Sequence, residues 1–434
     1  MSLMRIDDLF HFEKGILQSS KCTEGQFDFI TASSEWKTHN EYTHDCEALV
    51  FAAAASGSLG RTHHVNGKFI SSDLCFIITA KDPIKLPIDL KFYHMIFNEF
   101  KNDIVNSTKA GTSKEAIGMK AFGNYKLPYF DIDKQIVTKV QFVNLRESKI
   151  ELKIELTQQL ILIKQLRQAF LREALQGKLV KSTNTKETGK QLLEKIKAEK
   201  AQLIAEKKLK KEKGLPTITE DEIPFEIPEH WVWCNFDDIS ETIFDMEHQM
   251  PKAVSNGGVM FLSAKDLLDD GTINYLNDVK YISEEDYEYF TRNFKPQKND
   301  IIYSRRGANL GKSRIVKTKE KYLASYSCCT IRTLNPNLKY INFLLDSGFT
   351  LKQATLNTTN NSIPDLGINK IKRFKVPLPP LHEQEQIVAK LEELMSFCDG
   401  LEQSIKESQG YNEMLLQQVL REALQGEDLA IKIP

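Results

Sequence analysis

The sequence lacks the features that indicate secretion or membrane insertion. No apolar run among its 434 residues approaches the roughly 18 residues that a transmembrane helix needs. The first residues, MSLMRIDDLFHFEKG, carry acids early and contain no continuous apolar segment, unlike a secretory signal. The seven cysteines form no regular framework, and only Cys328 and Cys329 are adjacent. This cysteine usage favours a reducing compartment, so we expect a cytoplasmic protein.

Charge of either sign is not in excess. The 58 Lys and Arg residues and 59 Asp and Glu residues give a net charge of −1. A polyanionic partner must therefore be bound by local basic patches, because the surface as a whole is neutral. A chain of 49.7 kDa is too long for one ordinary core, so we expect two or more domains.

An internal repeat is the main signal in the sequence. The heptapeptide LREALQG stands at residues 171–177 and again at 420–426, an offset of 249. At this offset residues 111–128 align with 360–377, and SLGRTHHV matches NLGKSRIV at an offset of 251. The matches keep their order along the chain. We therefore interpret the chain as a tandem duplication.

Each copy ends in a predicted long helix, the first from about Gln135 to Gln176 and the second from about Ile387. Apolar residues in both follow a heptad pattern, and Gly177 and Gly426 are suitable C-terminal stops. The predicted seam of the first helix consists of Ile136, Val140, Val143, Ile150, Ile154, Ile163, Leu166 and Phe170.

A seam of this length needs a partner, and the economical solution pairs the two helices with each other. Packing of each helix on its own domain is the alternative. The predicted fold class is α+β: two mixed α/β domains separated by a long antiparallel two-helix coiled coil, with a pseudo-twofold internal repeat.

A charged segment joins the two copies. Residues 178–226 contain a predicted helix rich in Lys, Glu and Ala that ends near Gly214 and Pro216. We prefer to interpret it as a solvated connector. Phosphate contact by the pairs Lys207-Lys208 and Lys210-Lys211 is the alternative.

The stretch GANLGKS, residues 307–313, resembles a phosphate-binding P-loop. Its glycines are one residue too close, however, and the residues that follow predict a strand and a turn where a helix is required. The first copy reads GSLGR, with Arg61 in place of the lysine. We therefore predict a glycine-rich β-turn and no nucleotide site.

Catalytic and metal-binding patterns are also missing. His63-His64 has no third ligand at a useful spacing, and no Ser-His-Asp or paired-carboxylate arrangement follows from the order of residues. We therefore expect a non-catalytic protein with no metal of its own.

Basic residues occur at matching places in the two copies. Residues 305–321 contain seven Lys or Arg residues and one Glu, and the first copy has Arg, His and Lys on the equivalent turn. Such side chains beside Gly, Ser and Asn suit phosphate contacts and guanine reading. A solvated hairpin tip is the alternative. The predicted DNA-binding residues are Ser58, Arg61, His63, His64, Lys68, Arg305, Arg306, Asn309, Lys312 and Arg314, followed by Ser33, Ser34, Trp36 and Lys37.

Two segments resemble a known family. KVPLPPLHEQEQIVAKLEELMSFCDGLE, residues 375–402, is similar to the opening of the second conserved helix in type I restriction–modification specificity subunits. DEIPFEIPEHWVW, residues 221–233, resembles the lead-in to that family's second target-recognition domain. The first copy lacks such a lead-in, which predicts a shorter edge strand or a less stable first domain.

The resemblance implies a DNA specificity subunit without an active site. Each recognition domain would read one half of a bipartite target, and the helix pair would set the spacer. The implied boundaries are a first recognition domain (1–133), a first conserved helix (134–178), a linker (179–226), a second recognition domain (227–381) and a second conserved helix (382–434).

The implied partners are double-stranded DNA and two methyltransferase subunits, which restriction subunits can join. These partners would carry S-adenosylmethionine, ATP and Mg, with no cofactor on this chain. Docking is expected on the conserved helices and the linker, with Arg172, Glu173, Arg421 and Glu422 as the predicted contact residues. The rival hypothesis is a coiled-coil scaffold that dimerises and does not read DNA. The DNA target does not follow from the sequence.

Overall fold

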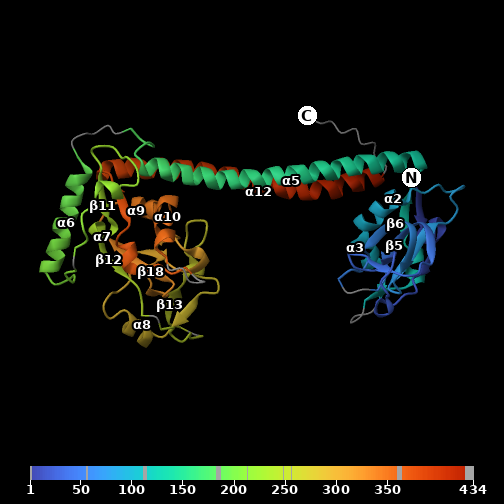
Figure 1. Cartoon of the computed structure of the whole chain (residues 1–434), viewed down its shortest axis with the longest axis horizontal. Coiled ribbons are helices and arrows are strands. Elements are labelled where there is room, and N and C mark those ends of the chain that lie inside the picture. Colours follow the sequence, from blue (N-terminus) through green and yellow to red (C-terminus); the bar gives the residue numbers. More distant parts are fainter. Residues whose placement is uncertain are drawn as a thin grey trace. The chain divides into compact units, whose positions relative to one another are not determined.

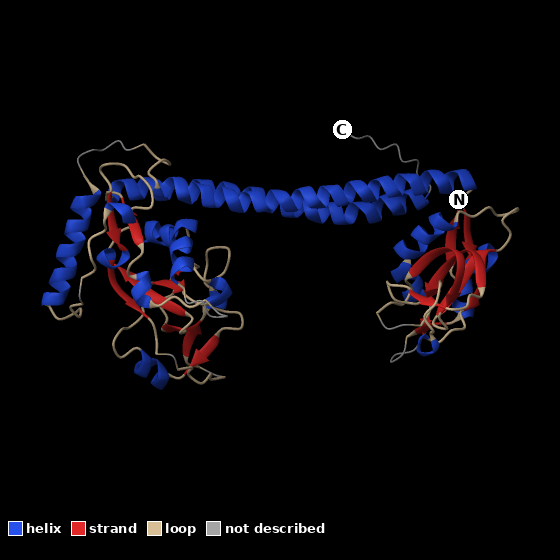
Figure 2. Cartoon of the chain, viewed as in Figure 1, coloured by secondary structure: helices blue, strands red, loops and turns tan. Residues whose placement is uncertain are grey.

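The computed structural model describes residues 2–54, 57–110, 115–181, 187–212, 214–247, 249–255, 257–358 and 364–425; side chains of the last helix are described to residue 415 and at 418. Its contacts form two compact units. Unit 1 comprises Met1–Gln158 and Ile405–Pro434, and unit 2 comprises Gln159–Ser404. Both units mix helices and strands (Figure 2), as the predicted mixed α/β class requires.

A six-stranded sheet forms the centre of unit 1, in the order β2-β7-β5-β6-β3-β4. Neighbouring strands are antiparallel except β3 and β6, which are parallel. Successive residues of β5 point to opposite faces, so Leu49 and Phe51 join one apolar cluster and Ala48 and Val50 another. The sheet is thus buried on both faces. The strands are β2 (Phe10–Lys14), β3 (Phe27–Ile30), β4 (Lys37–His39), β5 (His44–Ala52), β6 (Thr62–Ser71) and β7 (Cys75–Ala80).

Short helices cover this sheet (Figure 1). The helix α2 packs against β5 and β6, and the Asp89 side chain caps its first turn by accepting from Phe92 N at 2.9 Å. The remaining elements of unit 1 are β1 (Ser2–Arg5), α1 (Ile6–Leu9), η1 (Ser19–Lys21), α2 (Leu90–Glu99), α3 (Lys101–Thr108), β8 (Lys109–Ala110), β9 (Ala116–Ile117), α4 (Met119–Asn124) and β10 (Lys126–Tyr129).

Unit 2 contains a four-stranded sheet, β12-β18-β15-β16, and a three-stranded sheet, β14-β13-β17. The strands are β11 (Val232–Asn235), β12 (Ser240–Phe244), β13 (Val259–Leu262), β14 (Lys280–Ile282), β15 (Ile301–Ser304), β16 (Ser313–Ile315), β17 (Tyr322–Ala324), β18 (Cys328–Thr333) and β19 (Lys375–Leu378). The helices are α6 (Gly189–Ala205), η2 (Glu220–Glu222), α7 (Phe236–Ile239), η3 (Ala264–Asp266), α8 (Glu284–Phe290), η4 (Gly307–Asn309), α9 (Leu338–Leu345), α10 (Gly348–Asn357) and α11 (Ile368–Ile371).

The two units share one frame, which confirms the predicted duplication. The order β2-β7-β5-β6 in unit 1 corresponds to β12-β18-β15-β16 in unit 2, and every neighbouring pair is antiparallel in both. The units differ in what is added: β3 and β4 extend the sheet of unit 1, whereas β13, β14 and β17 form a separate sheet in unit 2.

The strand pair next to each long helix is also repeated. β1 pairs with β10 and β11 pairs with β19, each over four residues in antiparallel register. The edge strand of the first copy is therefore as long as that of the second. The expected shortening, inferred from the missing lead-in, is wrong, because the paired residues lie just after the point where the lead-in would stand.

Two long helices, α5 (Ile132–Leu175) and α12 (Leu381–Gln425), lie side by side within each unit. In unit 1, Asn412 Nδ2 of α12 donates to Lys149 O of α5 at 3.2 Å. In unit 2, Arg167 Nη2 contacts Asp399 Oδ1 at 2.7 Å and Glu402 Oε2 at 3.3 Å. The start of α5 thus meets the end of α12, as antiparallel pairing predicts.

The predicted seam of the first helix is partly wrong. Ile163 is buried, and Leu166 and Phe170 are partly buried. The five residues before them are exposed on α5 in unit 1, with exposed fractions of 44–62%: Ile136, Val140, Val143, Ile150 and Ile154. Thr138, Phe142 and Leu156 are buried instead. The heptad pattern of the first copy therefore describes an apolar stripe, Ile136, Val140, Val143, Ile150 and Ile154, that the described side chains of α12 do not cover.

Candidate nucleic-acid interface

A turn with two left-handed glycines occupies the same place in both units. Gly57 and Gly60 have φ of 77° and 81°, and Gly307 and Gly311 have φ of 76° and 92°. A side chain is disfavoured at such angles. Strand β16 begins directly after the turn of unit 2, so the helix that a P-loop requires does not follow it. The prediction of a glycine-rich turn is confirmed.

In each unit, a side-chain oxygen from a helix accepts a hydrogen bond from the backbone directly after the glycine turn. In unit 1, Thr62 N donates to Asn98 Oδ1 on α2 at 3.2 Å. In unit 2, Ser313 N donates to Asp346 Oδ1 at the end of α9 at 2.8 Å. Each turn therefore presents its side chains from a fixed backbone. Neither helix residue was identified from the sequence, because the pairing depends on the folded arrangement.

In unit 1 the predicted residues of the loop after β3 lie against those of the glycine turn. Arg61 Nη1 donates to Ala32 O at 3.1 Å and to Ser58 Oγ at 3.3 Å. Trp36 Nε1 donates to His63 Nδ1 at 3.2 Å, and the two rings meet edge to face. The loop after β3 and the glycine turn thus form one polar surface.

His63 has a defined protonation state in this surface. Its Nδ1 accepts a hydrogen bond, so the neutral ring carries its proton on Nε2, which is buried and has no partner among the described residues. Burial lowers the pKa of His63, and the nearby Arg61 lowers it further. The imidazole is therefore neutral at physiological pH, and its acceptor nitrogen orients the exposed Trp36 ring.

The other predicted residues of unit 1 lie in different settings. Ser34 and Lys37 are exposed, whereas Ser33 Oγ donates to Glu35 O at 2.6 Å. His64 Nε2 lies 2.7 Å from Glu47 Oε1, and Lys68 Nζ lies 4.7 Å from the centre of the Tyr42 ring. Their roles in DNA reading remain predictions.

In unit 2 two predicted arginines are inside the protein. Arg305 is 2% exposed, and its guanidinium group contacts Asp245 Oδ2 at 3.1 Å and Asp365 Oδ1 at 2.9 Å. Arg314 is 5% exposed, and it contacts Asp346 Oδ2 at 2.7 Å. Side chains held in this way position the turn and do not extend into solvent, which differs from the accessible basic side chains that we expected.

Three predicted residues of this turn remain accessible. Arg306 lies 5.5 Å from the centre of the Tyr326 ring and 3.9 Å from Asp365. Asn309 Nδ2 donates to Ala264 O at 3.2 Å. Lys312 Nζ contacts the exposed Asp269 at 2.7 Å, and this contact lowers the pKa of Asp269. All three are partly exposed.

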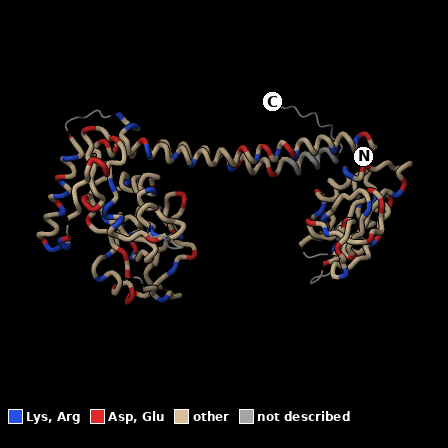
Figure 3. The backbone as a smooth tube through the Cα atoms, viewed as in Figure 1, with Lys and Arg blue, Asp and Glu red and all other residues tan. Residues whose placement is uncertain are grey.

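The local charge of this turn is smaller than its sequence indicates. Asp245, Asp269, Asp346 and Asp365 all form ion pairs with it, although none belongs to residues 305–321. Figure 3 shows acidic and basic residues interspersed over unit 2. Lys317 and Lys319 are exposed and have no ion pair in the described part of the chain. These two lysines are therefore the free cations of the segment.

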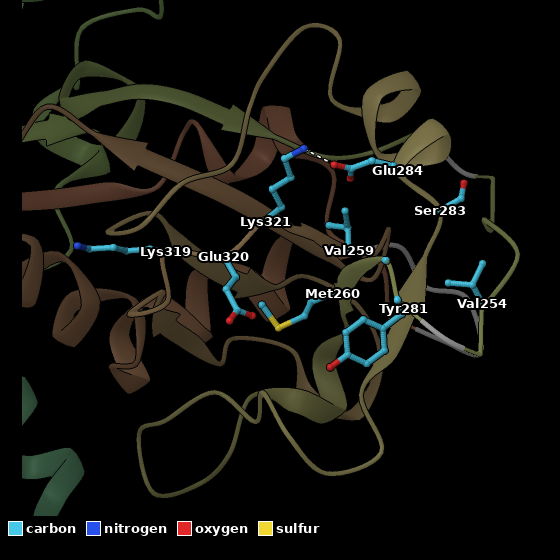
Figure 4. A pocket seen from close by; sticks show the side chains of 11 residues that line it. Val254, Val259, Met260, Tyr281, Ser283, Glu284, Lys319, Glu320 and Lys321 are labelled. Atoms are coloured by element: carbon cyan, nitrogen blue, oxygen red, sulfur yellow. Dashed lines mark hydrogen bonds and ion pairs between the residues drawn. The ribbon is translucent and has the colours of Figure 1, made fainter.

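A hollow of about 880 Å³ lies beside the separate sheet of unit 2 (Figure 4). Met260 of β13 and Tyr281 of β14 line it, together with Lys319 and Lys321. Lys321 forms an ion pair with Glu284. This hollow was not predicted from the sequence. The sequence feature closest to it is the pair Gly257-Gly258, which lines the hollow and has positive φ at both residues.

The first LREALQG segment has a clear packing role. Leu171, Ala174 and Leu175 are buried in the core of unit 2. A side chain at Gly177, whose φ is 69°, would clash with Pro228 of the lead-in segment. Arg172 and Glu173 are exposed. The side chains of Arg421 and Glu422 lie outside the described residues, so docking through these four residues remains a prediction.

No group of three or more His, Cys, Asp or Glu side chains in the described ranges is arranged to hold a metal ion. None of the helices described here is long and apolar enough to cross a bilayer.

Comparison with known proteins defines the class of this fold. Residues 253–408 match the model of the type I restriction modification DNA specificity domain. The EcoAI type I specificity subunit of Escherichia coli is 30% identical over 250 residues, which cover 56% of this chain and 41% of that protein. The EcoDI type I specificity subunit of Escherichia coli is 21% identical over 444 residues, which cover 98% and 88%. The match to the first of these relatives thus spans about two fifths of its length.

Solved structures have the same fold. The HsdS subunit from Thermoanaerobacter tengcongensis matches with a TM-score of 0.57 at 14% identity, covering 98% of this chain and 96% of that one. A structure described as the basis of complex assembly in the type I R-M system matches with a TM-score of 0.63, also at 14% identity, covering 98% and 97%. The resemblance seen in the sequence is confirmed: residues 253–408 match the type I DNA specificity domain, and the chain is similar to type I restriction–modification specificity subunits.

Proposed function

We propose that this chain is the DNA-reading subunit of a type I restriction–modification enzyme and has no active site of its own. One observation carries the proposal: the same four-strand frame and glycine turn occur in two units, and the match to the family's DNA specificity domain covers the glycine turn and three of the four frame strands of unit 2, β15, β16 and β18. A scaffold without DNA reading, the rival hypothesis, gives no reason for two such turns.

Each unit is proposed to read one half of a bipartite DNA target. Unit 1 would use the surface formed by Ser58, Arg61 and Trp36, and unit 2 would use Arg306, Asn309 and Lys312. The strands added to the frame differ between the units, which supports two different half-sites. Phosphate contacts would set the register on the duplex, and contacts to base edges would give the specificity.

The two long helices are proposed to set the spacing between the half-sites, in a pseudo-twofold arrangement of two recognition domains. A helix of 44 residues is roughly 66 Å long at about 1.5 Å per residue. Half-sites about 34–36 Å apart, one turn of the duplex, present the same face to a protein. Ion pairs such as Arg167–Asp399 support a stiff antiparallel pair.

The exposed apolar stripe of α5 supports docking of a partner helix. At about 100° per residue, the five stripe residues fall within an arc of about 80°, and the buried Thr138, Phe142 and Leu156 lie on the opposite side of the helix. The helix is thus apolar on two faces, and only one of them is covered by the residues that the structure describes. Exposed apolar patches of this kind mark interaction sites.

The proposed partners are two methyltransferase subunits that bind S-adenosylmethionine and methylate adenine, with restriction subunits as further partners that use ATP and Mg. This chain would bind none of these cofactors. The proposed location is the cytoplasm, where the cellular DNA and reduced cysteines are found together. All seven cysteines are free thiols in the structure.

The proposal is tested by methylation of a randomised duplex library with the purified chain and its methyltransferase subunit. We expect methyladenine only within a two-part motif of fixed spacing. The variant Arg306→Ala should relax one position of the second half by about 1–3 kcal/mol of discrimination if Arg306 contacts guanine. The control is Arg292→Ala, which removes an exposed arginine that is also paired with an acid, Glu247.

Methylation without a two-part motif would contradict the proposal. An unchanged motif with Arg306→Ala would assign this residue to phosphate contact.

Assembly is tested by substituting Arg172, Glu173, Arg421 and Glu422 together. We expect the methyltransferase no longer to co-purify, and unchanged co-purification would refute docking at this surface.

A further inference from the structure

A lysine-rich segment follows α6 in unit 2 and is separate from the glycine turn. Lys207, Lys210 and Lys211 are exposed, and in the described ranges none of the three forms an ion pair. Lys208 pairs with Glu206 at 2.8 Å. Residues 189–214 contain nine lysines and four glutamates, so this part of a nearly neutral chain is strongly positive.

Helix α6 is fixed to the body of unit 2. Leu193 and Ile196 are buried in its core. Lys200 Nζ donates to Asp237 O at 2.6 Å and contacts Asp237 Oδ2 at 3.2 Å, and Lys197 contacts Asp238 at 3.2 Å. Two of the helix's lysines are therefore used for structure, and the helix is not the solvated connector that the sequence favours.

The far end of the lysine segment is fixed as well. Glu212 forms an ion pair with Lys372, and Asn235 Nδ2 donates to Pro216 O at 3.2 Å. Described residues of this segment, Lys207 and Lys210 among them, line a hollow of about 680 Å³ together with Lys372, Asn293 and the acids Asp237, Asp238 and Glu241. The free ammonium groups therefore project from a segment that is ordered before any ligand binds, which lowers the entropy cost of binding.

Lys207 occupies a backbone position that favours glycine. Its φ is 60°, and it follows the end of α6, where Lys207 N donates to Ile204 O at 3.1 Å and Lys208 N donates to Leu203 O at 2.9 Å. Glycine is the usual residue at this helix stop, and a side chain in the left-handed region costs about 1 kcal/mol. The strained backbone at Lys207 makes its side chain a candidate for a function.

We propose that Lys207, Lys210 and Lys211 bind the phosphate backbone of duplex DNA beside the second recognition domain, independently of base sequence. The inference rests on the proposed function. Three free cations on a fixed segment complement phosphates, which dominate affinity for DNA. An acidic protein is a poorer fit, because protein interfaces have an apolar core, and Leu209 and Leu215, the large apolar residues of the segment, are both partly buried.

The test measures binding of the complex with its methyltransferase to a target duplex and a scrambled duplex over a range of salt concentrations. The triple variant Lys207→Gly, Lys210→Gln, Lys211→Gln should lower the slope of log K against log salt by about 0.9 per lysine, or about 2.7 in total. The slope should fall for both duplexes, and the ratio of their affinities should not change.

Two variants separate DNA binding from folding. Lys207→Gly alone should keep or raise the melting temperature, because glycine relieves the left-handed strain, yet lower the slope by about 0.9. The control variant Lys190→Gln removes an exposed lysine from the first turn of α6. This helix of 17 residues separates Lys190 from Lys207 by about 25 Å, so the control should leave the slope unchanged.

An unchanged slope in the triple variant would overturn the inference, as would an equal fall with Lys190→Gln. Weaker assembly with the methyltransferase at an unchanged slope would assign the segment to a protein partner and would also overturn it. Failure of the proposed function has a different result, since the unmodified complex would then bind target and scrambled duplexes equally.

Discussion

The apolar stripe of α5 allows a sharp test of partner docking. We consider Val140→Gln, Val143→Gln, Ile150→Gln and Ile154→Gln in one chain. Each side chain is about half exposed, so the replacements remove little packing within unit 1. Glutamine has a higher helix propensity than valine or isoleucine, so α5 should keep its helical structure. The change therefore acts on the surface that a partner would cover.

The size of the effect follows from the exposed fractions. Full burial of a valine or isoleucine side chain contributes about 1.5–3 kcal/mol. Roughly half of each stripe side chain remains to be buried on docking, so each replacement should cost about 1 kcal/mol of binding free energy. Four replacements then cost about 4 kcal/mol, which weakens association with the methyltransferase about 1,000-fold.

Titration calorimetry of the chain with its methyltransferase subunit measures this loss. The matched control is Val137→Gln, because Val137 is 54% exposed but lies about 100° around the helix from Ile136. We expect the control to bind within a factor of two or three of the parent chain. Unchanged association of the quadruple variant, or an equal loss with the single control, would refute docking at the stripe.

Three further predictions concern stability and pH. Removing the buried guanidinium group by Arg305→Leu should destabilise unit 2 by about 2–4 kcal/mol in urea unfolding, because Asp245 and Asp365 each lose an ion pair with it; an unchanged midpoint would contradict the network. Burial raises the pKa of Asp89, but hydrogen bonds from Lys139 and from the α2 backbone outweigh it, so the net pKa is lowered. Its contribution to stability is present above the unfolded pKa of about 3.9 and is lost as pH falls through the folded pKa, and Asp89→Asn should remove this acid dependence of the unfolding midpoint. Burial lowers the pKa of His63, so its ring should become protonated only below the ordinary histidine pKa of about 6.5, which should break the hydrogen bond from Trp36 and change Trp36 fluorescence; a fluorescence change above that pH that His63→Gln abolishes would contradict the neutral ring.

The sequence predicted which helices and turns are present better than it predicted which residues they pack against. The duplication, both long helices and the glycine turn follow from periodicity and residue type, and all are present in the structure. The predicted seam of the first helix was expected to pack against the second long helix, and for five of its residues this was wrong. A heptad pattern shows which residues share a face of a helix but not what covers that face. Val140 and Ile154 fit the pattern as well as Ile163 does, yet only Ile163 is buried.

The candidate site was predicted less well, for electrostatic reasons. Counting charges over residues 305–321 gives a strongly basic turn, but the acids that neutralise it come from other elements. Asp365 is 60 residues from Arg305 in sequence and 2.9 Å from it in space. Local composition contains no information on such pairs. In unit 1 the contact between Trp36 and His63 likewise depends on the folded sheet.

The two-sided character of α5 affects how this protein must be produced. A chain made without its proposed partner leaves five large aliphatic side chains in contact with water, and surfaces of this kind favour self-association. Cells that synthesise such a chain in excess would lose the surplus to aggregation or proteolysis, so balanced synthesis with its partner would protect it. Co-expression should accordingly raise the yield of intact protein, and the glutamine-substituted chain should no longer need it.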